Sequence, residues 1–302
     1  MRVLIGIVLG AAVAFAAPDL VLWAEPGLQP AFAVTMLLVG SLVRRDQLRA
    51  FAAAPLRAGA GLVAQYTLMP LMAWAISLGF GDPTVRTGIV LVGCMPGAMA
   101  SNVMTVLLRG DLVLSVTMTT LATLACPLVL AAWLPLLADT RMAVPVGALV
   151  WNATWMVVLP VTAGIVLRAA RPALPGWWDR AATAVAAAAI VLIVLVVVAA
   201  NRDALEDIGP ALAIAMVALN VAAYAAAHAF ATLLRWPAAQ RRTLVVEVGM
   251  QNAGLGSVLA LAHLGAAGAV PSAFYTALCV ITASLALPFV ERLRARSRTS
   301  SA

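Results

Sequence analysis

Apolar segments about the length of a membrane span follow one another along almost the whole chain. A transmembrane helix needs about 20 consecutive apolar residues. A domain in water carries about 25% charged residues, whereas this chain has 10%. We therefore predict an all-α membrane protein in contact with the lipid bilayer. The ten segments are approximately 3–17, 28–43, 56–79, 87–108, 112–137, 145–167, 181–200, 210–234, 243–264 and 270–290.

The first of these segments has a second interpretation. Arg2, the apolar stretch after it and the Ala-Phe-Ala sequence at 14–16 are also typical of a signal peptide. Cleavage would leave nine spans. We favour ten, because ten spans explain the distribution of positive charge better.

All nineteen basic residues are arginines, and their positions indicate the orientation of the chain. With ten spans, sixteen arginines fall on one side of the membrane, and only Arg86, Arg141 and Arg202 fall on the other. Loops rich in arginine remain on the cytoplasmic side. We therefore expect a multi-pass protein of the cell inner membrane with both termini in the cytoplasm. The net charge of +7 is explained by topology, so we predict no nucleic-acid partner.

Glu247 is the one carboxylate inside an apolar segment, and the other eleven acidic residues lie at or near segment ends. A charge at the centre of a bilayer costs at least about 2.5–3.5 kcal/mol on insertion scales. Such a residue is therefore a candidate functional site. Gly249, Gln251 and Asn252 follow it closely, so freed backbone carbonyls and amide oxygens are expected beside the carboxylate.

The ten segments divide into five and five, and the fourth of each half is interrupted. Residues 93–102 read GCMPGAMASN, and residues 248–256 read VGMQNAGLG. Because five is odd, the halves would insert with opposite orientations. Interrupted segments at matching positions point to a transporter binding site. We predict two inverted five-helix repeats, with broken helices four and nine crossing; two ordinary kinked helices are the alternative.

A broken helix offers two kinds of site. Half-helix N-termini carry free N–H groups that suit an anion, and half-helix C-termini carry carbonyls that suit a hard cation. Ser115 and Thr119 are four residues apart and share one face of a helix. Transition metals would favour His or Cys ligands, so this set of oxygen ligands favours Na⁺. Each of these side chains alone is also compatible with a bond to its own helix backbone.

Three stretches resemble the bile acid:sodium symporter family, in particular its bacterial ten-helix members. They are LVGCMPGAMASNVMT (91–105) with RGDLVLSVTMT (109–119), VEVGMQNAGL (246–255) and AQYTLMP (64–70). The resemblance covers nearly the whole chain. It implies a single transporter unit over 1–302, with a panel (about 3–43 and 145–200) and a core (about 56–137 and 210–290).

The resemblance also implies two sodium sites behind the crossing of spans four and nine. The first would use Ser101, Asn102, Ser115, Thr119 and Glu247. The second would use Gln65, Glu247, Gln251 and the backbone carbonyls of Val248 and Met250.

The anion side departs from the family pattern. Some relatives place a Thr where this chain has Met99, and a His-Asn pair where it has Cys279 and Val280. Fewer polar donors remain, so we expect a compact carboxylate such as pantoate or a 2-oxo acid; a bulkier steroid remains the alternative. The candidate substrate-binding residues are Ala98, Met99, Asn252, Ala253, Cys279 and Thr282.

These features predict a sodium-coupled symporter of an organic anion that works by alternating access. Proton coupling through Glu247 is a variant of this hypothesis. A passive channel or a non-transporting sensor on the same scaffold is the alternative. An intramembrane enzyme is not predicted, because the sequence has no paired aspartates, HExxH motif or plausible Ser/His neighbours. The sequence does not indicate an oligomeric state.

Overall fold

Helices account for nearly all regular structure in the described part of the chain. The computed structural model describes residues 10, 13–43, 55–139, 141, 143–171, 174–200 and 202–285. The first predicted segment, the end of the tenth and both termini therefore lie wholly or largely outside the described residues. The helices are α2 (Asp19–Leu22), η1 (Glu25–Gly27), α3 (Leu28–Leu42), α5 (Pro55–Ser77), α6 (Pro83–Cys94), α7 (Ala100–Leu107), α8 (Leu112–Leu137), α9 (Val146–Ala153), the π-helical turn η2 (Thr154–Val158), α10 (Leu159–Ala170), α11 (Gly176–Ala200), α12 (Arg202–Leu233), α13 (Ala238–Gly249) and α14 (Ala253–Leu285).

These bounds follow the apolar segments, and the differences have physical causes. Two long helices are interrupted by a glycine in the left-handed region, Gly209 with φ +67° and Gly265 with φ +76°. These glycines lie at or near predicted segment boundaries, and such a φ is readily adopted by glycine. Of the described helices, five are long and apolar enough to cross a membrane, so the chain is a multi-pass membrane protein.

Three apolar segments that we began directly after an arginine, at about 87, 181 and 243, lie in helices that begin four or five residues earlier, at Pro83, Gly176 and Ala238. Asp82 caps α6 by accepting hydrogen bonds from the N–H groups of Thr84 (2.7 Å) and Val85 (3.4 Å). An arginine near a helix end can bury its methylene stem and keep its charge in water, so arginine does not mark the end of a membrane helix.

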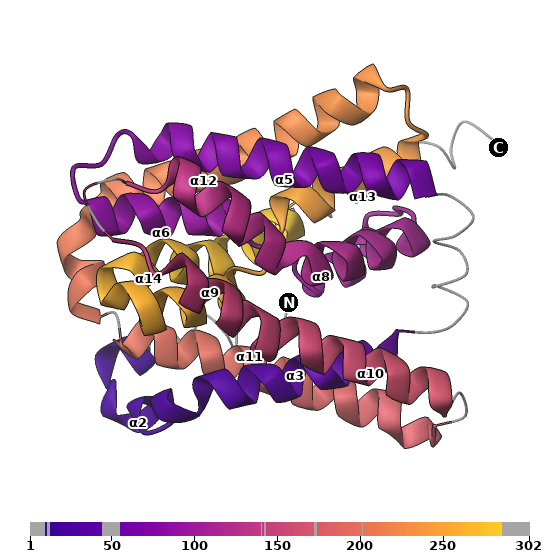
Figure 1. The fold of residues 1–302 in the computed structure, drawn as a ribbon, viewed down its shortest axis with the longest axis horizontal. Helices are drawn as coiled ribbons and strands as arrows, with labels where there is room; N and C mark the ends of the chain where they lie inside the picture. The colour runs from indigo at the N-terminus through magenta and orange to yellow at the C-terminus, as the bar shows by residue number, and fades with distance from the viewer. Residues whose placement is uncertain are drawn as a thin grey trace.

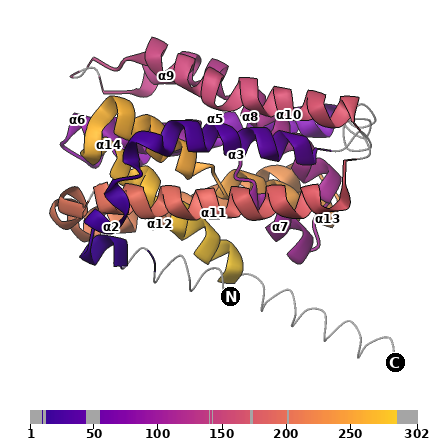
Figure 2. The ribbon, with the colours of Figure 1, turned by 90° about the horizontal axis from the view of Figure 1, so that it is seen from below.

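The helices form two groups that lie side by side. In Figure 1, α3, α10 and α11 run along the lower edge, and α5, α6, α12 and α13 occupy the upper part. Figure 2 shows α3 between α10 and α11. α3 and α10 approach closely because Gly40 and Gly164 face backbone atoms of the opposite helix. Outside the bundle, large apolar side chains such as Leu128, Ile214 and Leu233 are exposed, as a lipid-facing surface requires.

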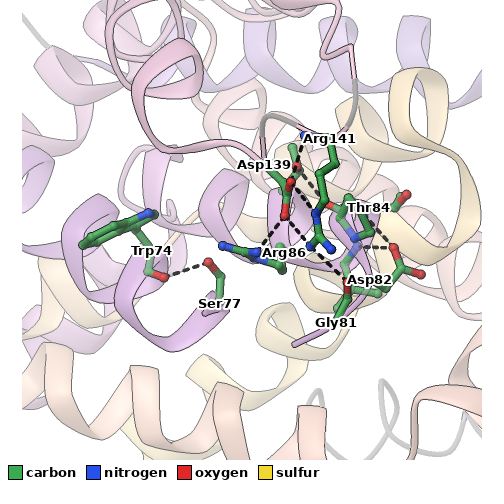
Figure 3. Close-up of polar contacts among 11 residues, drawn as sticks. Trp74, Ser77, Gly81, Asp82, Thr84, Arg86, Asp139 and Arg141 are labelled. Carbon is green, nitrogen blue, oxygen red and sulfur yellow. Dashed lines mark hydrogen bonds and ion pairs between the residues drawn. The ribbon is translucent and has the colours of Figure 1, made fainter. Parts of the chain in front are cut away.

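The loops at one end of the bundle are held together by a buried carboxylate. Asp139 follows α8, and its side chain is 3% exposed. It accepts hydrogen bonds from Arg141 and lies 2.8 Å from the Arg86 guanidinium (Figure 3). Arg141 also donates to the carbonyl of Gly81, at 3.1 Å. Arg86 and Arg141, two of the three arginines that we predicted on the side opposite the cytoplasm, therefore lie together around Asp139.

Candidate cation and substrate site

The two interrupted segments meet at the centre of the site. α6 ends at Cys94 and α7 begins at Ala100, while α13 ends at Gly249 and α14 begins at Ala253. Between these ends, the Ala98 N–H donates to the Met250 carbonyl and the Asn252 N–H donates to the Pro96 carbonyl, both at 2.7 Å. Gly97 and Gln251 pair as a short antiparallel bridge. Prolines and glycines more than 150 residues apart thus produce two breaks that hydrogen-bond to each other.

Glu247 lies on α13 just before the second break and is fully buried. Its Oε1 atom accepts hydrogen bonds from the hydroxyls of Ser101 (2.6 Å) and Ser115 (2.5 Å). Its Oε2 atom accepts one from Thr119, at 2.7 Å. The first sodium-site residues expected from the sequence therefore lie around one carboxylate, contributed by α7, α8 and α13.

Further oxygens lie beside the carboxylate. The Ser115 hydroxyl is 2.9 Å from Asn102 Oδ1 and 3.1 Å from Thr105 Oγ1. A hydroxyl has one hydrogen to donate, so Ser115 cannot donate to Asn102 Oδ1 and to Glu247 at once. Carboxylate, amide and hydroxyl oxygens therefore lie together, and oxygen ligands are what a hard cation requires.

Gly97 lets the first break come close to Glu247. A Cβ atom at this position would lie 2.6 Å from Glu247 Oε2. Any other residue would displace either the carboxylate or the break, so glycine is required here for close backbone approach.

The residues proposed for a second cation are buried, and several of their polar atoms lack partners. Gln251 Nε2 donates to the Val248 carbonyl at 2.8 Å, whereas its Oε1 atom has no partner in the described part of the chain. Gln65, on α5, is fully buried, and neither of its amide atoms has a partner among the described residues. Buried polar groups are usually hydrogen-bonded, so these amides fit a site that takes a ligand.

Two adjoining hollows lie beside the breaks, on the side that faces α3. Their volumes are about 120 Å³ and 70 Å³, and both are lined by Met36, Met99 and Asn252. The smaller hollow contains five of the six predicted substrate residues, namely Ala98, Met99, Asn252, Ala253 and Cys279. The sixth, Thr282, lines neither; its hydroxyl is 3.2 Å from the Tyr224 hydroxyl.

Asn252 is oriented by the start of α14. Its Oδ1 atom accepts a hydrogen bond from the Leu255 N–H at 3.2 Å, as expected for an asparagine at a helix N-cap. The N–H groups of Ala98 and Asn252, two of the candidate substrate-binding residues, tie the two breaks together and are not free to bind an anion. Anion recognition would therefore fall to later N–H groups of α7 and α14 and to the Asn252 amide.

The sequence interpretation missed several residues of the site. Met36 and Phe32 from α3 line the hollows, as do Thr120, Thr123 and Thr276. Thr105 lies next to Ser115. Thr105 is four residues after Ser101, and the same-face argument that paired Ser115 with Thr119 would have found it. Phe32 and Met36 are apolar, so nothing in the sequence distinguishes them from ordinary core residues.

Among the described residues, no group of three or more His, Cys, Asp or Glu side chains could hold a metal ion. The site consists of one carboxylate, hydroxyls and amides.

Comparison with known proteins identifies the family to which the chain belongs. Residues 29–209, more than half of the chain, match the model of the Sodium Bile acid symporter family. The chain belongs to this family.

Three relatives match the chain over different lengths. An uncharacterized sodium-dependent transporter, YocS from Bacillus subtilis (strain 168), is 31% identical over 98% of the chain and 94% of its own length. A probable chloroplastic sodium/metabolite cotransporter, BASS1 from Arabidopsis thaliana, is 31% identical over 77% of the chain and 58% of its own length. Sodium/bile acid cotransporter 4 from Homo sapiens is 27% identical over 74% of the chain and 53% of its own length.

The symporter family and these relatives consist of transporters and not enzymes. The resemblance on which the sequence analysis relied is therefore confirmed, and Na⁺ is supported as the coupled ion.

Proposed function

We propose that the protein is a symporter that couples the entry of two sodium ions to the entry of an organic anion by alternating access. The observation that carries this proposal is Glu247, a buried carboxylate ringed by three hydroxyls where two broken helices meet. A charge at such depth is costly, and a bound cation would neutralise it. The family match supports sodium as that cation.

The first ion would use Glu247 with Ser101, Asn102, Ser115 and Thr119. The second would use Glu247 with Gln65, Gln251 and the Val248 and Met250 carbonyls. The unpartnered amide oxygens of Gln65 and Gln251 support the second site. Gln251 Nε2 now bonds to Val248, so its amide would have to turn to present Oε1 to the ion.

The anion would bind in the hollows between the breaks and α3. The smaller hollow is largely apolar, with Met36, Met99 and Cys279 beside the Asn252 amide and the Thr276 hydroxyl. The larger hollow adds the hydroxyls of Thr120 and Thr123. The apolar smaller hollow favours a compact carboxylate, such as pantoate or a 2-oxo acid, over a ligand with many hydroxyls. Methionine is flexible, so taurocholate is the comparison ligand that tests the size argument.

Alternating access would move the two groups of helices relative to each other. The panel would comprise about 3–43 and 145–200, and the core about 56–137 and 210–290, as two inverted repeats in a ten-span bundle. The hollows lie between these groups, because Phe32 and Met36 belong to the first and the breaks to the second. The protein would lie in the inner membrane with both termini in the cytoplasm.

Uptake into proteoliposomes tests the proposal. Sodium-dependent accumulation of one of the candidate carboxylates against its gradient is expected. A passive channel would only equilibrate the anion, and a non-transporting sensor would bind it without uptake. Replacing sodium with choline at fixed pH separates sodium coupling from proton coupling.

A further inference from the structure

The carbonyl of Gly249 is held by two buried side chains that have no place in the proposed cation sites. In a continuous helix it would accept from the N–H four residues later, but α13 ends here. It instead accepts from Asn220 Nδ2 at 2.9 Å and from the Tyr275 hydroxyl at 3.0 Å. Asn220 also donates to the Tyr275 hydroxyl at 3.1 Å. Both side chains are fully buried, one on α12 and the other on α14.

Gly249 lies between the two residues whose carbonyls we assign to the second cation. The three consecutive carbonyls have three different partners. The Val248 carbonyl accepts from Gln251 Nε2, the Gly249 carbonyl from the pair Asn220 and Tyr275, and the Met250 carbonyl from the Ala98 N–H. Each peptide unit is planar, so fixing the Gly249 carbonyl also fixes the N–H of Met250 and limits how the neighbouring units can turn.

We propose that Asn220 and Tyr275 are positioning residues for the second cation. By holding the Gly249 carbonyl toward α12 and α14, they keep the flanking Val248 and Met250 carbonyls oriented for the ion. This inference rests on the proposed function. The N–H of the same peptide unit, that of Met250, donates to the Val246 carbonyl at 2.9 Å as the last bond of α13. Asn220 and Tyr275 therefore fix the carbonyl side of a unit that the helix holds only at its N–H side.

The Asn220 side chain supports a specific role. Its Oδ1 atom is buried and has no partner among the described residues. A buried acceptor without a partner is costly, and leucine would fill the same space without that cost. What asparagine adds is the donor to Gly249. A role limited to joining α12 and α14 would require only packing.

Tyr224 provides a matched control for Tyr275. Its ring also packs on Gly249, where a Cβ atom would collide with it. Its hydroxyl, however, lies 3.4 Å from the Cys279 carbonyl and 3.2 Å from the Thr282 hydroxyl, and it makes no hydrogen bond to the Gly249 carbonyl among the described residues. Tyr275→Phe and Tyr224→Phe therefore each remove one buried hydroxyl near the same glycine, and only the first removes a bond to the break.

The test is the thermal unfolding of the full-length, detergent-purified protein, titrated with sodium chloride and, at equal ionic strength, with choline chloride. Tyr275→Phe and Asn220→Leu are expected to raise the half-saturating sodium concentration about two- to tenfold, the size expected for one neutral hydrogen bond. Tyr224→Phe should match the wild type. Two variants with different geometry guard against the failure of one to fold.

A purely structural role would lower the unfolding temperature equally in sodium and in choline, with the half-saturating sodium concentration unchanged. That result in both Tyr275→Phe and Asn220→Leu would overturn the inference while leaving sodium binding by the wild type intact. A wild type that is not stabilised by sodium would overturn the proposed function itself, and this inference with it.

Discussion

Gly97→Ala is a single-methyl change that tests whether the carboxylate of Glu247 lies where the account requires. The added Cβ atom would be 2.6 Å from Glu247 Oε2, but 3.6 Å from the Glu247 backbone carbonyl oxygen. The added Cβ atom therefore clashes with the carboxylate and not with the backbone of Glu247. Backbone movement is opposed by the two hydrogen bonds that join the breaks on either side of Gly97.

The size of the effect follows from these distances. Relief of the contact from 2.6 Å to about 3.4 Å requires a shift of about 0.8 Å. The same shift would stretch the Thr119–Glu247 hydrogen bond from 2.7 Å to about 3.5 Å, at the edge of hydrogen-bond range. It would also move Oε2 by about 0.8 Å relative to the other proposed ligands of the first ion. Taking one displaced contact as equal to one hydrogen bond to a charged group, about 1.5–3 kcal/mol, we expect sodium affinity to fall by about 10- to 150-fold.

The assay is sodium-dependent thermal stability, because a ligand that binds only the folded state raises its apparent stability by mass action. The half-saturating sodium concentration is the readout and should rise by the factor above. The unfolding temperature in choline should also fall, because the stretched hydrogen bond is present without sodium. Gly59→Ala is the control, because a Cβ atom there meets nothing within 4 Å. An unchanged sodium titration for Gly97→Ala would refute the placement of the carboxylate against the first break.

Three further predictions concern the two ion sites, the topology and the loop carboxylate. Thr119→Ala should weaken mainly the first ion and Gln65→Ala mainly the second, so each should raise the sodium concentration needed for half-maximal transport; if neither does, the ligand assignment is wrong. A reporter fused after Arg298 should be active only as a cytoplasmic reporter, and periplasmic activity would contradict the ten-span topology. Hydrogen bonds and charge from Arg141 hold the pKa of Asp139 well below its usual value. The ionised Asp139 therefore stabilises the fold fully above the unfolded-state pKa of about 3.9. This stabilisation is lost as pH falls through the folded-state pKa. The difference in unfolding temperature between wild type and Asp139→Asn should therefore be constant from pH 5 to 8 and shrink below about pH 4; a loss between pH 5 and 8 would contradict this.

The sequence could predict features that depend on local chemistry. Apolar length located the helices, and Pro96 with Gly97 located the first break. The lone carboxylate identified Glu247, and spacing placed Ser115 and Thr119 on one face of α8, where both reach that carboxylate.

Features that depend on contacts between distant segments could not be predicted in this way. Met36 looks like an ordinary apolar residue, and only the packing of α3 against the breaks makes it part of the hollows. Asn220 appears as a single polar residue in an apolar span. Its role becomes visible only when the end of α13 frees the Gly249 carbonyl beside it. Three helices begin before the arginines that we took as segment boundaries, because an arginine is compatible with the first turns of a helix and only the apolar stretch begins after it.

The most direct test of the central claim is the uptake current in proteoliposomes containing wild type or Glu247→Gln. Two sodium ions with one monovalent anion would carry one net positive charge inward, which a membrane potential favours by about 2.3 kcal/mol per 100 mV. Pantoate, pyruvate and taurocholate should be supplied in parallel, in sodium and in choline at the same pH. We predict an inward current only when sodium and a transported anion are both present, and no current for Glu247→Gln although the variant still inserts and folds. Equal currents in choline, or wild-type currents from Glu247→Gln, would contradict a sodium symporter built around this carboxylate.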